Sequence, residues 1–402
     1  MTRQQTAIQF VTENYVQFDR IRYDVISNKL QIRKDLGHNW SEMTTQDVNS
    51  IVCQCALECD ANITSREILT VLKSDFIPSV HPLREYILSL PPYTPEQPDW
   101  IDFVAQQVSM TDKASENLWR ICFKKWFVAM VASWINDDVV NHQVLVLIGK
   151  QGIFKTTWLE HLIPPHLREY QCKLANTQQL NKDERLRIAE FALINLDEID
   201  ALNNRELNQL KSVITATDVN ERAAYAYSKE RRIRLASFCA SGNRRDFLTD
   251  ITGNRRWLPF EVEAIQNPFY TTLPYDLMYA QAYALATDPM FSYWFDLNEI
   301  QTIDSHNQDF REQTNEEQLL RVFFAIPAQN APNAKFLTTA EISEKLISKG
   351  NIKNPLSLSR LGVLLSQQGF LSVRRGSPCK RGWIVYERDS EEINAERKML
   401  AK

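Results

Sequence analysis

The stretch that most constrains this 402-residue chain is VLVLIGKQGIFKTTW, residues 144–158. Its apolar start, Val144–Ile148, predicts a fully buried strand. A loop that contains Gly149 and Gly152 follows, and a helix is expected from Lys155 onward. A strand, a glycine-containing loop, Lys-Thr and a helix are together typical of a phosphate-binding P-loop.

The chemistry expected of this stretch follows from its residue types. Backbone N–H groups of such a loop and of a helix N-terminus converge on an anion. Lys155 is expected to reach the β- and γ-phosphates of ATP, and the hydroxyl of Thr156 to bind Mg²⁺, with Thr157 beside them. Phe154 stands where the usual G-x-x-x-x-G-K-[ST] spacing has its second glycine, and Phe takes left-handed dihedrals only at a cost. On this stretch alone, an ordinary strand–helix loop therefore stays an alternative.

Composition sets broad limits on the protein class. Apolar residues make up 44% and charged residues 24%, which is typical of a globular chain of two or three domains. The net charge of −4 gives no overall basic surface, so any contact with nucleic acid requires local patches. There is no apolar run of membrane-spanning length and no signal-peptide pattern, and the seven cysteines are scattered, so we expect a cytoplasmic protein with reduced thiols and no membrane partner. Cys53, Cys55 and Cys59 lack a zinc partner set, and Cys55 and Cys59 are expected to be core thiols on one helix face.

A second apolar run, Phe191–Leu196, predicts another buried strand, and it ends in Asp197-Glu198. Mg²⁺-dependent nucleotide hydrolysis needs acids at such a place. Asp197 would hold a Mg²⁺-bound water beside Thr156, and Glu198 would polarise the attacking water. An acidic turn after a strand is usually only solvated, but the phosphate-binding pattern upstream favours the functional interpretation.

A third apolar strand is expected at Ile233–Ala240, and it leads into Asn243, whose amide can orient the lytic water or contact the γ-phosphate. Further on, Arg255 and Arg256 lie on a turn just before another strand, Trp257–Val262. An arginine that reaches a neighbouring subunit's nucleotide is an arginine finger. An ordinary surface arginine is the alternative at this position.

Residues 218–229 are expected to form an exposed hairpin between these strands. Tyr225 and Tyr227, with Lys229 and Arg231 close by, are residue types that stack on bases and grip phosphates. A solvated surface hairpin without a nucleic-acid partner is an equal alternative.

These pieces, in this order and together with the phrase LTDITGNRRW at residues 248–257, resemble the virulence-associated protein E family of phage and mobile-element proteins. That family is related to superfamily 3 helicases within the AAA+ class, and the resemblance covers about residues 82–262. It implies a pore hairpin that grips DNA at about residues 222–231. The Walker A, Walker B, sensor and finger roles that it implies fall on Lys155, Thr156, Asp197, Glu198, Asn243 and one of Arg255 and Arg256.

The C-terminal part predicts a winged helix. Thr338-Thr339 can cap a first helix, residues 356–368 fit a second, and Phe370–Arg375 with Trp383–Arg388 fit a hairpin wing. Residues 335–388 contain ten Lys or Arg against three Glu, which favours DNA over a protein partner. The expected DNA contacts are Ser359, Arg360, Arg374, Arg375, Lys380 and Arg381.

The expected fold class is α/β, with a P-loop, AAA+-like sheet flanked by helices. The expected division is a small α/β domain (1–80), a helical segment (81–140), the P-loop ATPase core (141–262), a helical linker (263–330), the winged-helix domain (331–390) and a tail (391–402).

The function expected from all this is an ATP- and Mg²⁺-dependent DNA-remodelling ATPase or helicase that acts in replication of a phage or mobile element. A finger acting in trans implies a homo-oligomeric ring, and the resemblance suggests a hexamer. A separate primase is a conceivable partner, because residues 1–80 are too few for a catalytic primase domain. Two alternatives stay open, namely a nucleotide switch or initiator factor that does not hydrolyse ATP, and a winged-helix DNA-binding regulator with a decayed ATPase region.

Overall fold

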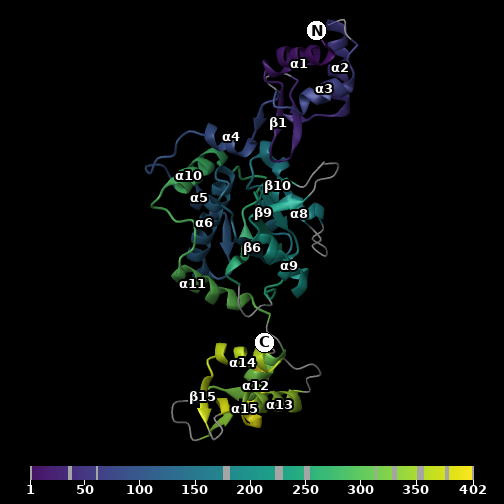
Figure 1. Ribbon diagram of the computed structural model, residues 1–402. Helices are drawn as coiled ribbons and strands as arrows, with labels where there is room; N and C mark the ends of the chain where they lie inside the picture. Colours follow the sequence, from purple (N-terminus) through teal and green to yellow (C-terminus); the bar gives the residue numbers. More distant parts are fainter. Residues whose placement is uncertain are drawn as a thin grey trace. The chain divides into compact units, whose positions relative to one another are not determined.

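The computed structural model describes residues 2–34, 39–59, 62–174, 182–221, 230–248, 254–312, 315–327, 333–350, 357–375 and 380–400. The chain is a mixed α/β protein that divides into two compact units (Figure 1). The first unit contains residues 1–247 and 254–310. The second contains residues 311–402 and the short segment that begins at Leu248.

A six-stranded sheet in the order β5-β12-β6-β11-β8-β7 lies at the centre of the first unit. Five neighbouring strands run parallel, and β5 is antiparallel at one edge. Strands β6, β8 and β11 are buried along their whole length, as expected where helices cover both faces of a parallel sheet. The strands are β5 Val108–Met110, β6 Val144–Ile148, β7 Gln171–Leu174, β8 Leu193–Leu196, β11 Ser237–Gly242 and β12 Trp257–Ile265.

One predicted strand has different bounds in the structure. The apolar run at Ile233–Ala240 is split, because Ile233 belongs to β10 (Glu230–Ile233), which pairs with β9 (Asp218–Glu221) in a separate antiparallel ribbon. The central strand β11 begins only at Ser237. Between them, the buried guanidinium of Arg234 donates to the carbonyl oxygen of Asn141 (2.8 Å) and to that of Ala236 (3.0 Å).

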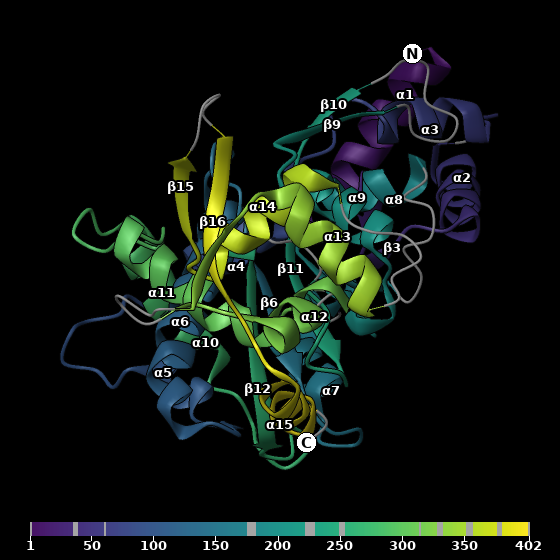
Figure 2. The ribbon, with the colours of Figure 1, turned by 90° about the horizontal axis from the view of Figure 1, so that it is seen from below.

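Helix α6, Glu116–Ile135, is the main packing helix of this unit. Its Trp and Phe residues are fully buried in the hydrophobic core. Helix α10, Tyr275–Thr287, packs against it. Figures 1 and 2 place α5, α6 and α10 on one side of β6, and α8 and α9 on the other. The further helices are α4 Pro82–Ser89, α5 Trp100–Ala105, α7 Lys155–Glu160, α8 Lys182–Glu190, α9 Asn204–Ile214 and α11 Leu297–Asn307.

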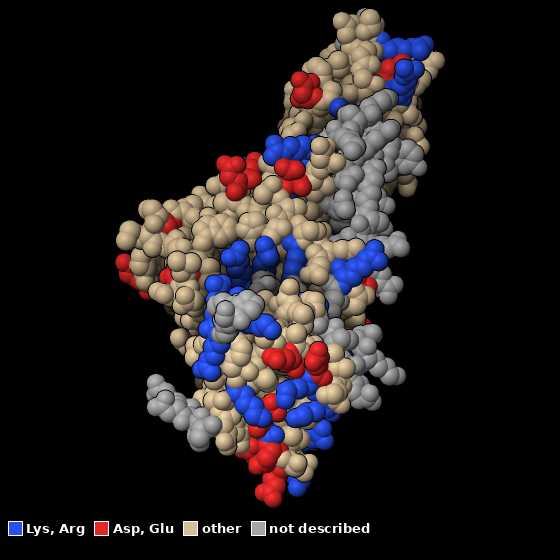
Figure 3. Space-filling view, turned by 60° about the horizontal axis from the view of Figure 1, so that its bottom comes forward, with Lys and Arg blue, Asp and Glu red and all other residues tan. Residues whose placement is uncertain are grey.

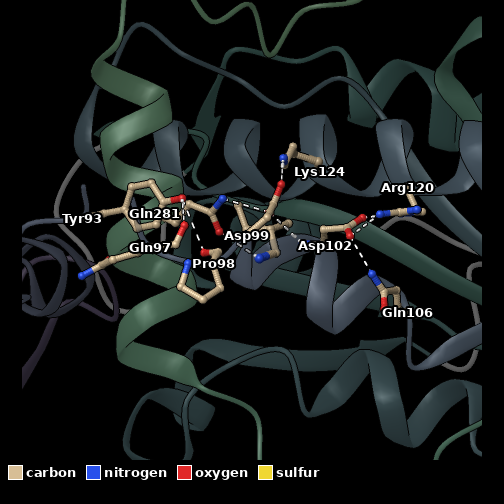
Figure 4. A network of polar contacts seen from close by, with 10 residues as sticks. Tyr93, Gln97, Pro98, Asp99, Asp102, Gln106, Arg120, Lys124 and Gln281 are labelled. Atoms are coloured by element: carbon tan, nitrogen blue, oxygen red, sulfur yellow. Dashed lines mark hydrogen bonds and ion pairs between the residues drawn. The ribbon is translucent and has the colours of Figure 1, made fainter. Parts of the chain in front are cut away.

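A polar network fastens α5 to α6 and α10 (Figure 4). Asp99, the N-cap of α5, accepts hydrogen bonds from the Asp102 amide (3.0 Å) and from Gln281 Nε2 (2.9 Å), and it pairs with Lys124. Asp102 pairs in turn with Arg120. Burial raises the pKa of Asp99, but the hydrogen bonds from Lys124, Asp102 and Gln281 outweigh it, so this pKa lies below its usual value. The N-cap and first turn of α5 are thus connected by hydrogen bonds and ion pairs to polar side chains of α6 and α10.

The N-terminal residues carry their own sheet, in the order β3-β2-β1-β4, and their own hydrophobic cluster. Strands β1 and β2 pair antiparallel as a hairpin. Cys55 is buried but Cys59, the last residue of α2, is exposed, so the expectation of two core thiols was wrong for Cys59. The elements are α1 Arg3–Val11, β1 Ile21–Asp24, β2 Lys29–Ile32, β3 Ser41–Glu42, α2 Thr45–Cys59, α3 Ser65–Leu72 and β4 Ser79–Val80.

The second unit is a small antiparallel sheet packed on helices, with β16 as the strand to which the others pair. Trp383 on β16 is buried in its core, and its indole N–H donates to Thr339 Oγ1 at 3.0 Å. Thr338 caps the first helix as predicted, since its Oγ1 accepts from the Glu341 amide (3.3 Å). The elements are α12 Asn315–Phe323, β13 Phe324–Ala325, β14 Ala334–Leu337, α13 Thr339–Gly350, α14 Leu358–Gln367, β15 Leu371–Arg375, β16 Lys380–Glu387 and α15 Ser390–Leu400.

Two features are absent from the described residues. None of their helices combines the length and the apolar character needed to cross a membrane. Nor do they contain a group of three or more His, Cys, Asp or Glu placed to hold a metal ion.

Candidate functional site

The carboxyl ends of β6, β11 and β8 meet at one edge of the central sheet, because the three strands are parallel neighbours. In the register, Gly242 lies opposite Ile148, and Ala240 lies opposite Leu196. A cavity of about 300 Å³ opens at this edge. It is lined by Gln151, Gly152, Phe154, Lys155, Thr156, Thr157, Asp197, Glu198, Ser241, Gly242 and Asn243. The structure thus brings the residues predicted from three separate strand ends to one place.

Lys155, the first residue of α7, is folded back over the loop. Its Nζ donates to the carbonyl oxygens of Gly149 and Lys150, both at 2.7 Å, and to Asn243 Oδ1 at 3.3 Å. The residue is only 7% exposed. Burial lowers the pKa of Lys155, and the charges of Asp200 and Asp197 oppose that shift. The ammonium group therefore links the β6 loop to the end of β11.

Asp197 is the centre of a second set of contacts. Its Oδ1 accepts hydrogen bonds from Ser241 Oγ (2.7 Å) and Thr156 Oγ1 (3.1 Å), and its Oδ2 pairs with Lys173 Nζ at 2.6 Å. Burial raises the pKa of Asp197, but the hydrogen bonds and charge of these neighbours, Lys173 first, bring this pKa below its usual value. The group is therefore a carboxylate near neutral pH, beside a hydroxyl. Both are oxygen ligands of the kind that Mg²⁺ prefers.

Sequence reasoning missed Ser241, Lys173 and Asp200 as parts of this site. Asp200 accepts from the Arg244 amide (3.0 Å), and its Oδ1 would lie 2.8 Å from a Cβ at Gly242. The weak signals for these residues were a Ser at the end of an apolar strand and a third acid after Asp197-Glu198. Lys173 gave no local signal, because it reaches Asp197 only through the pairing of β7 with β8.

The backbone of the site contains two non-glycine residues with left-handed dihedrals. Phe154 has φ 69° and ψ 17°, and Glu198 has φ 54° and ψ 48°. The left-handed conformation costs a non-glycine residue about 1–2 kcal/mol, so the backbone at Phe154 is strained where that of a glycine would not be. Gly149 meets a different constraint, since a Cβ there would lie 2.6 Å from the carbonyl oxygen of Val262.

Arg255 and Arg256 lie outside the cavity lining, on the turn Asn254–Arg256. Asn307 on α11 holds this turn, because its Nδ2 donates to the carbonyl oxygens of Asn254 (2.9 Å) and Trp257 (3.0 Å). The Arg255 side chain is exposed and Arg256 is half-buried. Their role as fingers in trans stays a prediction.

Of the residues predicted for the DNA hairpin, Tyr225, Tyr227 and Lys229 lie outside the described residues. Arg231 lies on β10, and its guanidinium pairs with Asp218 on β9 at 2.9 Å.

In the second unit, the predicted contact residues all lie on the surface. Ser359 and Arg360 are exposed near the start of α14. On the β15–β16 hairpin, Arg374 lies opposite Arg381, and Arg375 opposite Lys380. We call these four the basic hairpin residues; all are exposed, and no ion pair involves them within the described part of the chain.

Several of the other basic residues of this stretch have an acidic partner. One acid, Glu387, pairs with Lys335 (3.6 Å), Lys345 (2.7 Å) and Lys349 (3.9 Å). Figure 3 likewise shows Lys and Arg beside Asp and Glu on the same face of the molecule. One carboxylate offsets only one of these three lysine charges, whereas the four basic hairpin residues have no acid paired with them in the described part of the chain.

Comparison with known proteins identifies the central part of the chain. A family model described as virulence-associated protein E-like domain matches residues 98–312, more than half of the sequence. The chain belongs to the virulence-associated protein E-like family. The matched residues include the whole central sheet and the cavity, whereas residues 1–97 and 313–402 lie outside the family model.

One solved structure supports the fold of this virulence-associated protein E-like chain. The apo structure of the NrS-1 C-terminal region is similar at a TM-score of 0.50 and 12% identity, covering 95% of this chain and 99% of that one. Its A form has a TM-score of 0.48 and 11% identity, with 96% and 99% coverage. At these identities the likeness concerns the fold alone. No curated protein matches the sequence.

Proposed function

We propose that this chain is a P-loop, AAA+-like ATPase that uses Mg²⁺ and remodels DNA during replication of a phage or mobile element. The observation that carries the proposal is the convergence of Lys155, Thr156, Asp197 and Asn243 around one cavity, at the start of a helix and the ends of three parallel strands. Ligands of open α/β sheets bind at this edge, and helix N-termini attract phosphates.

Each residue has a part in the proposed reaction. Lys155 would leave the loop carbonyls for the β- and γ-phosphates. Thr156 and Asp197 fit Mg²⁺, since their oxygens already lie 3.1 Å apart and Asp197 is ionised, and bound Mg²⁺ would neutralise charge on the phosphates. Glu198, exposed on the cavity lining, would accept a proton from the attacking water, and Asn243 would orient that water. The exposed Arg255, or Arg256 beside it, would act on the nucleotide of a neighbouring subunit in a homo-oligomeric ring, which we propose to be a hexamer.

DNA is the proposed partner of this ATPase. The basic hairpin residues support a winged-helix contact with phosphates in the second unit. The strained Phe154 is the observation that favours the second candidate, a nucleotide switch that binds ATP without hydrolysing it.

The experiment that tests the proposal measures ATP hydrolysis with and without single-stranded DNA for the wild type, Lys155→Ala and Glu198→Gln. We expect turnover that DNA stimulates and that both substitutions abolish. ATP binding without turnover in the wild type would favour the switch. An absence of binding would leave only the DNA-binding regulator.

A further inference from the structure

A group of aromatic side chains borders the cavity beyond the phosphate-binding loop. Phe154 lines the cavity, and its ring lies edge-on to that of Phe269, with centroids 6.4 Å apart. The His161 ring meets Phe269 from the end of α7, at 5.5 Å and again nearly perpendicular. Phe269 is nevertheless 69% exposed, and Tyr270 next to it is 89% exposed. An exposed Phe269 ring in contact with a cavity-lining ring, followed in sequence by an exposed Tyr270, leaves apolar surface near a polar cavity without a partner among the described residues.

Sheet register explains why Phe269 lies beside the cavity-lining Phe154. Strand β12 pairs in parallel with β6, Glu261 lies opposite Ile148, and β12 continues to Ile265. The loop between β12 and α10 therefore begins beyond the level at which β6 gives way to the phosphate-binding loop. Its own turn is ordered by Asn267, whose Oδ1 accepts from the Phe269 amide at 3.0 Å and whose carbonyl oxygen accepts from the Tyr270 amide at 3.1 Å.

We propose that Phe269, with Phe154 beside it, is the surface on which a nucleotide base stacks when the phosphates occupy the loop. This inference rests on the proposed function. It adds a contact for the nucleotide base, which the proposed phosphate-binding residues do not touch. Stacking of a base on an aromatic ring is sequence-tolerant and strengthens binding by roughly tenfold or more. Phe154, at the glycine position, then has a use that repays part of its strained conformation.

The hydrogen bonding of His161 favours adenine over guanine. Its Nδ1 lies 2.7 Å from the carbonyl oxygen of Thr157. A carbonyl oxygen only accepts, so Nδ1 carries the hydrogen, and in that tautomer Nε2 is an acceptor. The exocyclic amine of adenine donates, whereas guanine presents an oxygen at the same place. The Tyr275 hydroxyl, which donates to the His161 carbonyl oxygen at 2.7 Å, holds this residue in position.

The test compares two ligands that share three phosphates and differ in the base. Binding of Mg·ATP and of inorganic tripolyphosphate with Mg²⁺ is measured by titration calorimetry for the wild type and Phe269→Ala. The matched control is Phe103→Ala, because Phe103 is 49% exposed on α5. We expect Phe269→Ala to weaken ATP binding about tenfold and to leave tripolyphosphate binding unchanged, with no effect of Phe103→Ala on either ligand.

The outcomes separate this inference from the function on which it rests. Wild-type protein that binds tripolyphosphate as tightly as ATP, or an equal loss of both ligands in Phe269→Ala, overturns the stacking surface and leaves the phosphate site standing. Wild-type protein that binds neither ligand overturns the proposed function itself. For the base preference, we expect wild type to prefer ATP to GTP and His161→Phe to lose that preference; an unchanged ratio overturns the role of His161.

Discussion

Charged side chains have close partners in the cavity of the first unit, whereas those on the basic hairpin of the second unit are exposed to solvent. In the cavity, Lys155 and Asp197 are each held by neighbours at hydrogen-bond distance. On the hairpin, Arg374 and Arg375 stand in solvent beside Lys380 and Arg381. A site of the first kind is organised before its ligand arrives, so its interactions are strong and weakly screened. A surface of the second kind attracts anions over a distance that added salt shortens.

The largest effect is expected from Lys155→Ala. Because this ammonium is the one cation among the cavity-lining residues, its loss should weaken binding of tripolyphosphate and of Mg·ATP by about a hundredfold. The measurement is titration calorimetry, with Lys150→Ala as control, because Lys150 is adjacent and exposed. A variant that binds as the wild type does would mean that the cavity is not the phosphate site.

The double substitution Arg374→Ala with Arg375→Ala should weaken DNA binding about tenfold at moderate salt. If both contact phosphates, the slope of log affinity against log salt should become shallower by about two. Fluorescence anisotropy over a salt series measures this, with Lys335→Ala as control, because Lys335 is already paired with Glu387. Equal losses of DNA affinity in the variant and the control would mean that pairing with Glu387 makes no difference to a basic residue's contribution to DNA binding.

A smaller effect concerns the pH dependence of stability at Asp197. Its pKa is lowered in the folded protein, so the carboxylate stabilises the fold at pH values above its unfolded pKa of about 4. That contribution is lost as the pH falls through the folded pKa. The free energy of unfolding, measured by urea titration from pH 6 to pH 3, should therefore fall less steeply in Asp197→Asn than in the wild type. Parallel curves would contradict the charge organisation ascribed to the cavity.

The smallest effect is expected at Glu387. Its side chain is only 14% exposed, but its three lysine partners are 34–57% exposed, and ion pairs open to solvent contribute about 0–1 kcal/mol, so Glu387→Gln should cost about that much in the free energy of unfolding. The freed lysines should strengthen DNA binding about twofold at low salt. Weaker DNA binding would show instead that Glu387 shapes the hairpin and does not merely neutralise it.

The sequence revealed the parts of the site that are local in the chain. Runs of apolar residues that lead to Lys155-Thr156, Asp197-Glu198 and Asn243 predicted the buried strands and their carboxyl ends. They could do so because a buried strand produces a short, continuous apolar run in the sequence. The contact between Lys173 and Asp197 was beyond such patterns, since it depends on which strands are neighbours. The exposure of Cys59 was missed for a related reason. Helical spacing places Cys59 on the same face as Cys55, but spacing does not show at which residue that face ceases to be buried.

The two glycines of the loop have different consequences for how the chain can vary. A methyl group at Gly149 would collide with the carbonyl oxygen of Val262, so no other residue fits there unless β12 also shifts. At Gly152 a Cβ would meet nothing within 4 Å, and only its φ of 84° resists replacement. Asn or Asp, which tolerate that backbone region, can therefore replace Gly152 but not Gly149. Relatives that differ at position 149 should differ in β12 as well, while position 152 can drift alone.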